Sequence, residues 1–261
     1  MKLSRRDALR AGGGLVAGGT VAGCVERRVT RRETNVESST TWALTPATGR
    51  ALDAAAFDAY IDEMETEYDD SGVRGQGGAP DGTFETAHVQ RLPVVRESSG
   101  QPGGAEPTLR PDDIDRNATA FPVVDAAVSR YELDGGRVRY WLWAAVDVRD
   151  ETYAGDAPAT VLSAGVSLRS GSVAETGDVS PAEETATVDL TGETVRRFPL
   201  AEGTTDVGTG DRTGEGGYYV VEWTGEVDDV QSVNGVCELD DGGGHDLAWS
   251  VGGGYKRVQQ L

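Results

Sequence analysis

Residues 131–143, YELDGGRVRYWLW, place two β-rich runs on either side of Asp134-Gly135-Gly136. Glycine adopts positive φ at little steric cost, and Asp-Gly between two such runs is a strong local indication of a β-hairpin. The stretch therefore predicts two antiparallel strands joined by a tight turn. Similar short runs follow, bounded by Gly, Asp or Pro: TVLSAGVSL (160–168), TATVDL (185–190), TVRRFPL (194–200), YYVVEW (218–223), VNGVCEL (233–239) and LAWSV (247–251).

One segment has helical periodicity instead. In residues 51–68, apolar side chains recur at spacings of three and four, opposite acidic ones, which predicts an amphipathic helix. Its expected buried face is made of Leu52, Ala56, Tyr60, Ile61, Met64 and Tyr68. Many short strands and a single helix predict a mainly β fold: an antiparallel β-sandwich, or a related barrel, with one N-terminal amphipathic helix and long Gly- and Pro-rich loops.

The charge balance is strongly acidic. The chain has a formal net charge of -20, and residues 24–261 carry 20 basic and 43 acidic side chains. Such a surface repels nucleic acid, so we expect no nucleic-acid partner. Lysine occurs only at Lys2 and Lys256. Acid excess with so little lysine resembles the proteins of extreme halophiles, in which molar salt screens the repulsion between like charges.

The N-terminal residues have three features in sequence: SRRDALR at 4–10, a weakly apolar run at 11–23, and VAGC at 21–24. The run is shorter than the ~20 apolar residues that a spanning helix needs. The three features resemble the signal of a twin-arginine-exported haloarchaeal lipoprotein, with Ala8 where that family often has Phe. The resemblance implies export through Arg5 and Arg6, and lipid attachment at Cys24 as the mature N-terminus.

The resemblance also implies a location and a domain plan. The protein is expected on the cell membrane, facing outside and held by the lipid on Cys24. Residues 1–23 are the expected signal peptide, residues 24–45 a flexible polar tether, and residues 46–261 a single globular, mainly β domain. The strongest later apolar run, YWLWAAV at 140–146, is too short to span a bilayer.

Known catalytic motifs are not matched. Ser167, in GVSLR, has Arg169 where a hydrolase nucleophile elbow needs glycine. GTGDRTGEGG at 208–217 has neither the spacing nor the lysine of a phosphate-binding loop. DIDRN at 113–117 begins like a calcium loop, but Ala118 and Val124 occupy positions that an EF-hand gives to Gly and Glu. Asn117-Ala118-Thr119 is a glycosylation sequon, so Asn117 is a candidate modification site.

Four residues have the side-chain types of a blue-copper site: Cys237, His88, His245 and Met64. Their spacing argues against copper, because Met64 lies in the expected helix and cupredoxins place Cys, His and Met on one loop. We therefore expect Cys237 to be a small buried residue, the histidines to be ordinary loop or strand residues, and the chain to have no metal or cofactor.

The aromatic run after the hairpin allows two interpretations. Trp141 and Trp143 fall on one face of the strand, and Tyr140 and Leu142 on the other. Apolar residues on both faces favour a central strand covered on both sides. The alternative is an exposed aromatic binding face made by Trp141 and Trp143.

These expectations favour a non-enzymatic protein: a lipid-anchored extracytoplasmic binding or accessory protein of a halophile, with a membrane-complex protein as a candidate partner. The alternative is a carboxylate-dependent hydrolase acting on cell-surface polymers. With two histidines and one lysine after residue 23, acid–base catalysis would fall to carboxylates. No particular pair stands out among the 43 acids.

Overall fold

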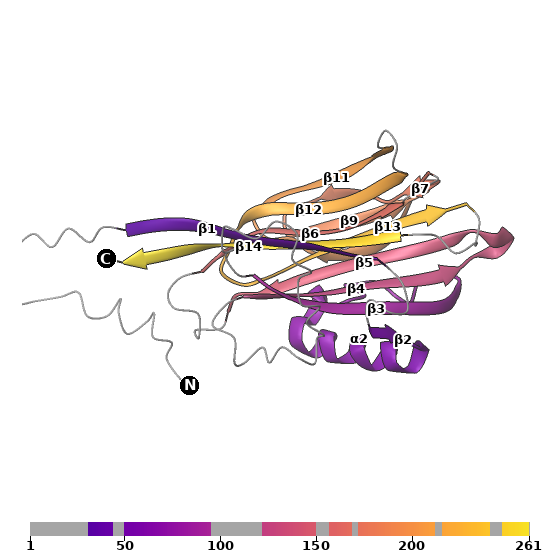
Figure 1. Ribbon diagram of the computed structural model, residues 1–261, viewed down its shortest axis with the longest axis horizontal. Helices are drawn as coiled ribbons and strands as arrows, with labels where there is room; N and C mark the ends of the chain where they lie inside the picture. The colour runs from indigo at the N-terminus through magenta and orange to yellow at the C-terminus, as the bar shows by residue number, and fades with distance from the viewer. Residues whose placement is uncertain are drawn as a thin grey trace, which may run out of the picture.

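A computed structural model of the chain describes residues 31–43, 50–94, 122–149, 157–168, 172–211, 216–240 and 247–260. Its described strands form antiparallel sheets, and the one α-helix among the described residues lies near the N-terminal end of the chain (Figure 1). The three described sheets are open, which confirms the mainly β sandwich and not the barrel alternative.

The strands belong to sheets of five, six and three members. The five-stranded sheet has the order β1 (Arg31–Ala43), β14 (Leu247–Gln260), β6 (Ala159–Leu168), β12 (Gly217–Val227) and β11 (Gly203–Asp211). The six-stranded sheet has the order β2 (Arg50–Leu52), β3 (Thr83–Pro93), β4 (Val123–Glu132), β5 (Val138–Asp147), β13 (Val230–Leu239) and β7 (Glu175–Thr176). The three-stranded sheet has the order β10 (Glu193–Pro199), β9 (Thr185–Leu190) and β8 (Asp178–Pro181).

The five- and six-stranded sheets pack face to face. Their central strands β6, β12 and β14 contact β4, β5 and β13, and apolar side chains such as Leu162 and Leu142 fill the space between them. Gly253 on β14 lies over β4: a Cβ there would come within 2.5 Å of Val124 Cγ2. The three-stranded sheet contacts β11, the edge strand of the five-stranded sheet, through β8, and β13 of the six-stranded sheet through β9 and β10, so it connects the two larger sheets.

The helix α2 (Ala54–Tyr68) covers the outer face of the six-stranded sheet. Asp53 caps its first turn by accepting a hydrogen bond from the Ala56 amide at 2.9 Å. Its buried residues are Phe57, Ile61, Met64 and Tyr68. The helical prediction for 51–68 is therefore confirmed with a later start, since Leu52 belongs to β2. The predicted buried face is correct at Ile61, Met64 and Tyr68, but it missed Phe57 and included Ala56 and Tyr60, which are only partly buried.

The hairpin predicted from YELDGGRVRYWLW joins β4 to β5. Its turn is a short 3-10 segment at Asp134–Gly136, where Gly135 has φ +82° and Gly136 φ +81°. Both angles lie in the left-handed region that favours glycine, as expected from the sequence. No helix in the described part of the chain has the length and apolar character needed to cross a bilayer.

The predicted tether at 24–45 is wrong over residues 31–43, which form β1 and pair antiparallel with β14 from Arg31↔Gln260 to Ala43↔Ala248. Alternate side chains Asn35, Glu37 and Ser39 are exposed. A polar edge strand has no apolar period to reveal it, and its partner lies more than 200 residues away in the chain.

The molecule has two opposite ends along its strands. The start of β1 and the end of β14 extend together past the other strands at the left of Figure 1, and the β4–β5 hairpin lies at the right. Gly253 of β14 and Val124 of β4 lie one over the other. From this point β14 runs to its C-terminal end at the left of Figure 1, and β4 runs the opposite way to the hairpin. We call these ends the ribbon end and the hairpin end.

Candidate functional site

The aromatic strand β5 contributes first to the core. Trp143 is 1% exposed, its Nε1 donates to the Ser71 carbonyl at 2.9 Å, and its ring meets Tyr68 edge-on at 5.5 Å between centroids. Ala145 follows on the same face beneath α2. The core interpretation is confirmed for Trp143.

Trp141 lies on the same face, beside the three-stranded sheet. It is also buried, with the Arg196 guanidinium carbon 4.5 Å from the centroid of its ring. Arg196 Nη1 donates to the carbonyls of Arg74 at 2.6 Å and Gly78 at 2.8 Å, which holds this cation over the ring. Burial lowers the pKa of Arg196 to about 10. Neither tryptophan is exposed, so the two do not form an open aromatic binding face.

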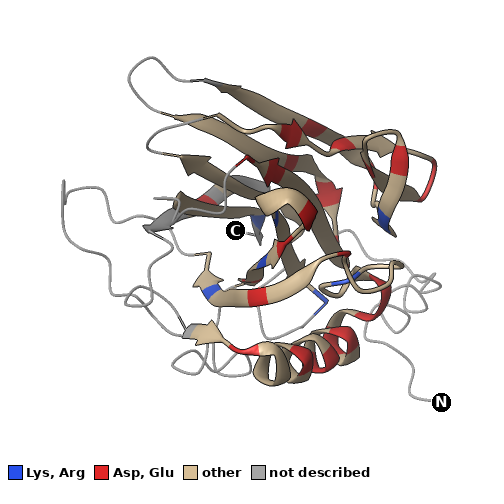
Figure 2. Cartoon of the chain, turned by 90° about the vertical axis from the view of Figure 1, so that its right-hand side faces the viewer, with Lys and Arg blue, Asp and Glu red and all other residues tan. Residues whose placement is uncertain are grey.

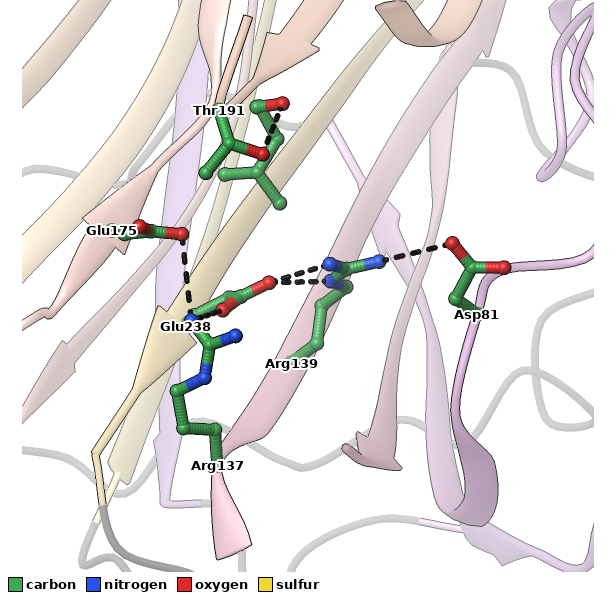
Figure 3. A network of polar contacts seen from close by, with 7 residues as sticks. Asp81, Arg137, Arg139, Glu175, Thr191 and Glu238 are labelled. Atoms are coloured by element: carbon green, nitrogen blue, oxygen red, sulfur yellow. Dashed lines mark hydrogen bonds and ion pairs between the residues drawn. The ribbon is translucent and has the colours of Figure 1, made fainter. Parts of the chain in front are cut away.

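A cluster of charged residues lies at the hairpin end of the same sheet (Figure 3). Glu238 on β13 is 1% exposed, and its two carboxylate oxygens accept hydrogen bonds from two arginines. Arg139 on β5 donates to Oε1 from Nε at 2.9 Å and from Nη2 at 2.5 Å. Arg137 donates to Oε2 from Nη1 at 2.7 Å. This buried carboxylate therefore has charge-assisted partners on both oxygens.

The cluster continues to the surface. Glu175 Oε2 on β7 lies 3.7 Å from Arg137 Nη1, and Asp81 Oδ2 lies 4.0 Å from Arg139 Nη1. The Asp81 side chain is 95% exposed, whereas the Arg137 side chain is 45% exposed. The cluster therefore presents alternating charges at the surface and keeps its central carboxylate inside.

A second buried carboxylate lies under the helix. Asp125 on β4 is 1% exposed, accepts from Tyr68 Oη at 2.8 Å and pairs with Arg91 Nε at 2.6 Å. Both buried acids are thus held in structural ion pairs, and their burial separates them from any substrate, which a catalytic carboxyl group must reach.

The other residues considered from the sequence are separated in space. Cys237 on β13 is fully buried, as predicted, and burial raises the pKa of its thiol to about 12. His88 lies on β3, where burial lowers its pKa. Met64 lies on the buried face of α2, and Ser167 lies in β6 between β12 and β14. Within the described residues, no group of three or more His, Cys, Asp or Glu side chains could hold a metal ion.

Five residues singled out from the sequence lie outside the described residues: Arg5, Arg6, Cys24, Asn117 and His245. Their assignments as export signal, lipidation site, modification site and histidine ligand or loop residue stay predictions.

The Glu238 cluster was not predicted from the sequence. One signal was present: VNGVCEL (233–239) places an acid in an otherwise apolar strand, and an ionisable residue there needs a partner. Arg137, in extended backbone just before β5, and Arg139 in β5 are two residues apart and so share one face. What the sequence did not contain was the register that brings Arg139 opposite Glu238.

Comparisons of the chain with protein-family models, with curated proteins and with solved structures found no match.

Proposed function

We propose that the chain is a twin-arginine-exported lipoprotein of a halophile that acts as a binding or accessory protein on the outer face of the membrane. The observation that carries this proposal is the order of basic pair, weakly apolar run and VAGC in residues 4–24, followed closely by β1 at Arg31. Six residues separate Cys24 from the first strand. An extended chain spans at most ~3.3–3.6 Å per residue, so a lipid on Cys24 would keep the start of β1 within ~25 Å of its attachment point.

Such a short connection would keep the domain near the membrane surface, which favours a role at that surface. A domain held this close has little freedom to search for distant partners, and its binding to a neighbouring membrane protein is aided by a high effective concentration. This supports an accessory role in a membrane complex.

The acid clusters also favour a non-catalytic protein over the hydrolase alternative. Hydrolysis of a glycosidic polymer uses two carboxyl groups on either side of the scissile bond, one of them protonated. Among the described residues, Glu238 and Glu175 are one pair of acids that lie opposite each other, in the register of β13 and β7. Both contact Arg137, and Glu238 is closed off from substrate by burial.

Two substitutions test the export and the anchor separately. Arg5→Lys with Arg6→Lys keeps the charge but removes the planar guanidinium pair, and should leave unprocessed precursor inside the cell. Cys24→Ser removes the thiol that accepts lipid, and should release the protein to the medium or leave it as uncleaved precursor. Cell fractionation and mass spectrometry of the mature N-terminus measure both results. A processed Cys24→Ser chain that still sediments with membranes would refute the lipid anchor.

The accessory role is tested by gentle detergent extraction in molar KCl, followed by quantification of the proteins that co-purify. A stoichiometric membrane protein is expected with the wild-type chain and not with Cys24→Ser. Recovery of the lipidated chain alone, together with release of sugars from cell-surface polymers by that preparation, would favour the hydrolase.

A further inference from the structure

The last part of β14 leaves the five-stranded sheet together with β1. Pairing of β14 with β6 ends at Tyr255↔Ala159, and the Lys256 amide then donates to the Pro158 carbonyl at 2.8 Å. From Arg257 to Gln260, the described partner of β14 is β1 alone, at Arg31–Thr34. The two strands form a projecting two-stranded ribbon, which extends from the body of the molecule in Figure 1.

The charge of this ribbon is opposite to that of the chain. Its eight residues, Arg31–Thr34 and 257–260, contain three arginines and one acid, Glu33, whereas residues 24–261 carry a net charge of -23. Lys256 precedes the ribbon and is paired with Glu226 at 2.8 Å. By contrast, α2 has five acids and no Lys or Arg, as the red bands on the helix in Figure 2 show. The ribbon thus has a net positive charge in a chain that is otherwise acidic.

The ribbon is also the described part of the chain that follows Cys24 most closely. We propose that the ribbon end is a membrane-contacting surface, and that its partners are the anionic headgroups of the bilayer in which the Cys24 lipid is inserted. This inference rests on the proposed function. Between Cys24 and the ribbon, Arg27 and Arg28 with the acid Glu26 add one more net positive charge to the same stretch of sequence.

The tether explains how such contacts persist in concentrated salt. At molar salt the Debye length is ~3 Å, so long-range attraction is lost and only direct contacts between arginine and phosphate survive. A short tether makes these contacts effectively intramolecular, which lets weak contacts orient a domain that they could not recruit. The lipid holds the protein on the membrane, and the ribbon sets its direction.

The orientation that follows places the hairpin end away from the bilayer. β4 starts beneath Gly253 and runs away from the ribbon for ten residues to reach the turn at Asp134. At ~3.3 Å per residue, the turn lies about 30 Å beyond that point. The Glu238 cluster at the hairpin end would therefore face outward, where a partner has access.

Two single-cysteine variants measure this orientation. Asn35→Cys labels an exposed position beside the ribbon, and Asp134→Cys labels the exposed hairpin turn. The lipid blocks Cys24 and burial shields Cys237, so a thiol-reactive fluorophore reports on the introduced site. The lipidated chain is placed in phosphatidylglycerol vesicles that contain headgroup spin-labelled lipid, in molar KCl. Strong quenching is expected at Asn35→Cys and little at Asp134→Cys. Equal or reversed quenching would overturn the inference.

A charge variant tests the headgroup contact itself. Arg31→Gln, Arg32→Gln and Arg257→Gln together should reduce quenching at Asn35→Cys by about twofold or more, because each arginine adds to the attraction for anionic lipid. The matched control removes three arginines elsewhere: Arg74→Gln, Arg130→Gln and Arg197→Gln. Phosphatidylcholine vesicles should give the same loss of quenching as the ribbon variant. Undiminished quenching with either the ribbon variant or neutral lipid would overturn the role of charge.

Mass spectrometry and sedimentation of the same samples separate the two proposals. A chain without lipid that does not sediment with vesicles refutes the proposed function and this inference together. A lipidated, sedimenting chain with an unquenched label at Asn35→Cys refutes this inference alone.

Discussion

Glu238 and Arg139 are register partners on β13 and β5, and their side chains repeat the pairing that their backbones make. Cys237, the neighbour of Glu238, points to the opposite face of the strand, into the core between the two large sheets. A slip of one residue would exchange the two and drive the carboxylate into that apolar core. The ion pair therefore favours one register for β5 and β13, two neighbouring strands of the six-stranded sheet.

Glu238→Gln is expected to lower the free energy of unfolding by about 3 kcal/mol, because it leaves the Arg139 guanidinium, 13% exposed, without its carboxylate. The lower end of the range for buried pairs applies because Arg137, the second partner, is 45% exposed. Urea unfolding followed by tryptophan fluorescence measures the change.

Glu226→Gln is the matched control, since Glu226 pairs with Lys256 at 2.8 Å but is 57% exposed. Its cost should be below about 1 kcal/mol, as is usual for a surface pair. Equal losses in the free energy of unfolding for the two substitutions would contradict the prediction that the buried Glu238 pair is more stabilising than a surface pair.

Trp143→Ala should cost about 3–5 kcal/mol, because it empties a core position between α2 and the six-stranded sheet. Trp143→Phe should cost less, as it keeps most of the ring but leaves the Ser71 carbonyl without its donor. Thermal melts of both variants check the order. A Trp143→Ala variant with an unchanged melting temperature would contradict the core assignment.

The parts of the fold that the sequence predicted are local. The hairpin depends on adjacent residues, Gly135 and Gly136, and the helix on a period of three to four residues, so both were visible. β1 was not, because its hydrogen-bond partner is the far end of the chain and its own residues are polar. A strand of this kind is defined by what it pairs with.

The same distinction applies to the candidate site. Burial of Cys237 and of the two tryptophans followed from the apolar residues around them in sequence. The contact of Arg196 with Trp141 joins residues 55 positions apart on different sheets, so no local pattern contained it. The proposed function rests on Arg5, Arg6 and Cys24, which belong to short sequence motifs that can be recognised without knowledge of the fold.

The Cys237 thiol gives a prediction for alkaline pH. Burial raises its pKa from 9.0 to about 12, so above pH 9 the unfolded chain loses a proton that the folded chain keeps. The free energy of unfolding should then fall as pH rises from 9 to about 12, by up to about 1.4 kcal/mol per pH unit for this one group. Cys237→Ala should flatten the fall between pH 9 and 10, before Tyr140, whose pKa burial raises to about 12, begins to contribute. Urea unfolding across this pH range measures the slope, and an equally steep fall in Cys237→Ala would contradict the assignment.

The acidic surface predicts that stability depends on salt. With a net charge of -23 on residues 24–261, repulsion between like charges opposes the compact state in dilute buffer. Raising KCl from ~0.1 to ~3 M shortens the Debye length from ~10 Å to below ~3 Å, and the melting temperature of the Cys24→Ser chain should rise with it. A flat curve would remove the argument for a halophile.

Concentrated KCl can also raise the melting temperature by a general effect on apolar burial. Charge variants of α2 distinguish that effect from the screening of charge repulsion. Asp62, Glu63 and Glu65 are exposed on α2, a helix with no cation of its own. Asp62→Asn, Glu63→Gln and Glu65→Gln together remove three negative charges without touching the buried face. The triple variant should melt higher than the parent at ~0.1 M KCl and at nearly the same temperature at ~3 M, because screening has already removed the repulsion there. Parallel curves for the two chains would assign the salt effect to apolar burial instead.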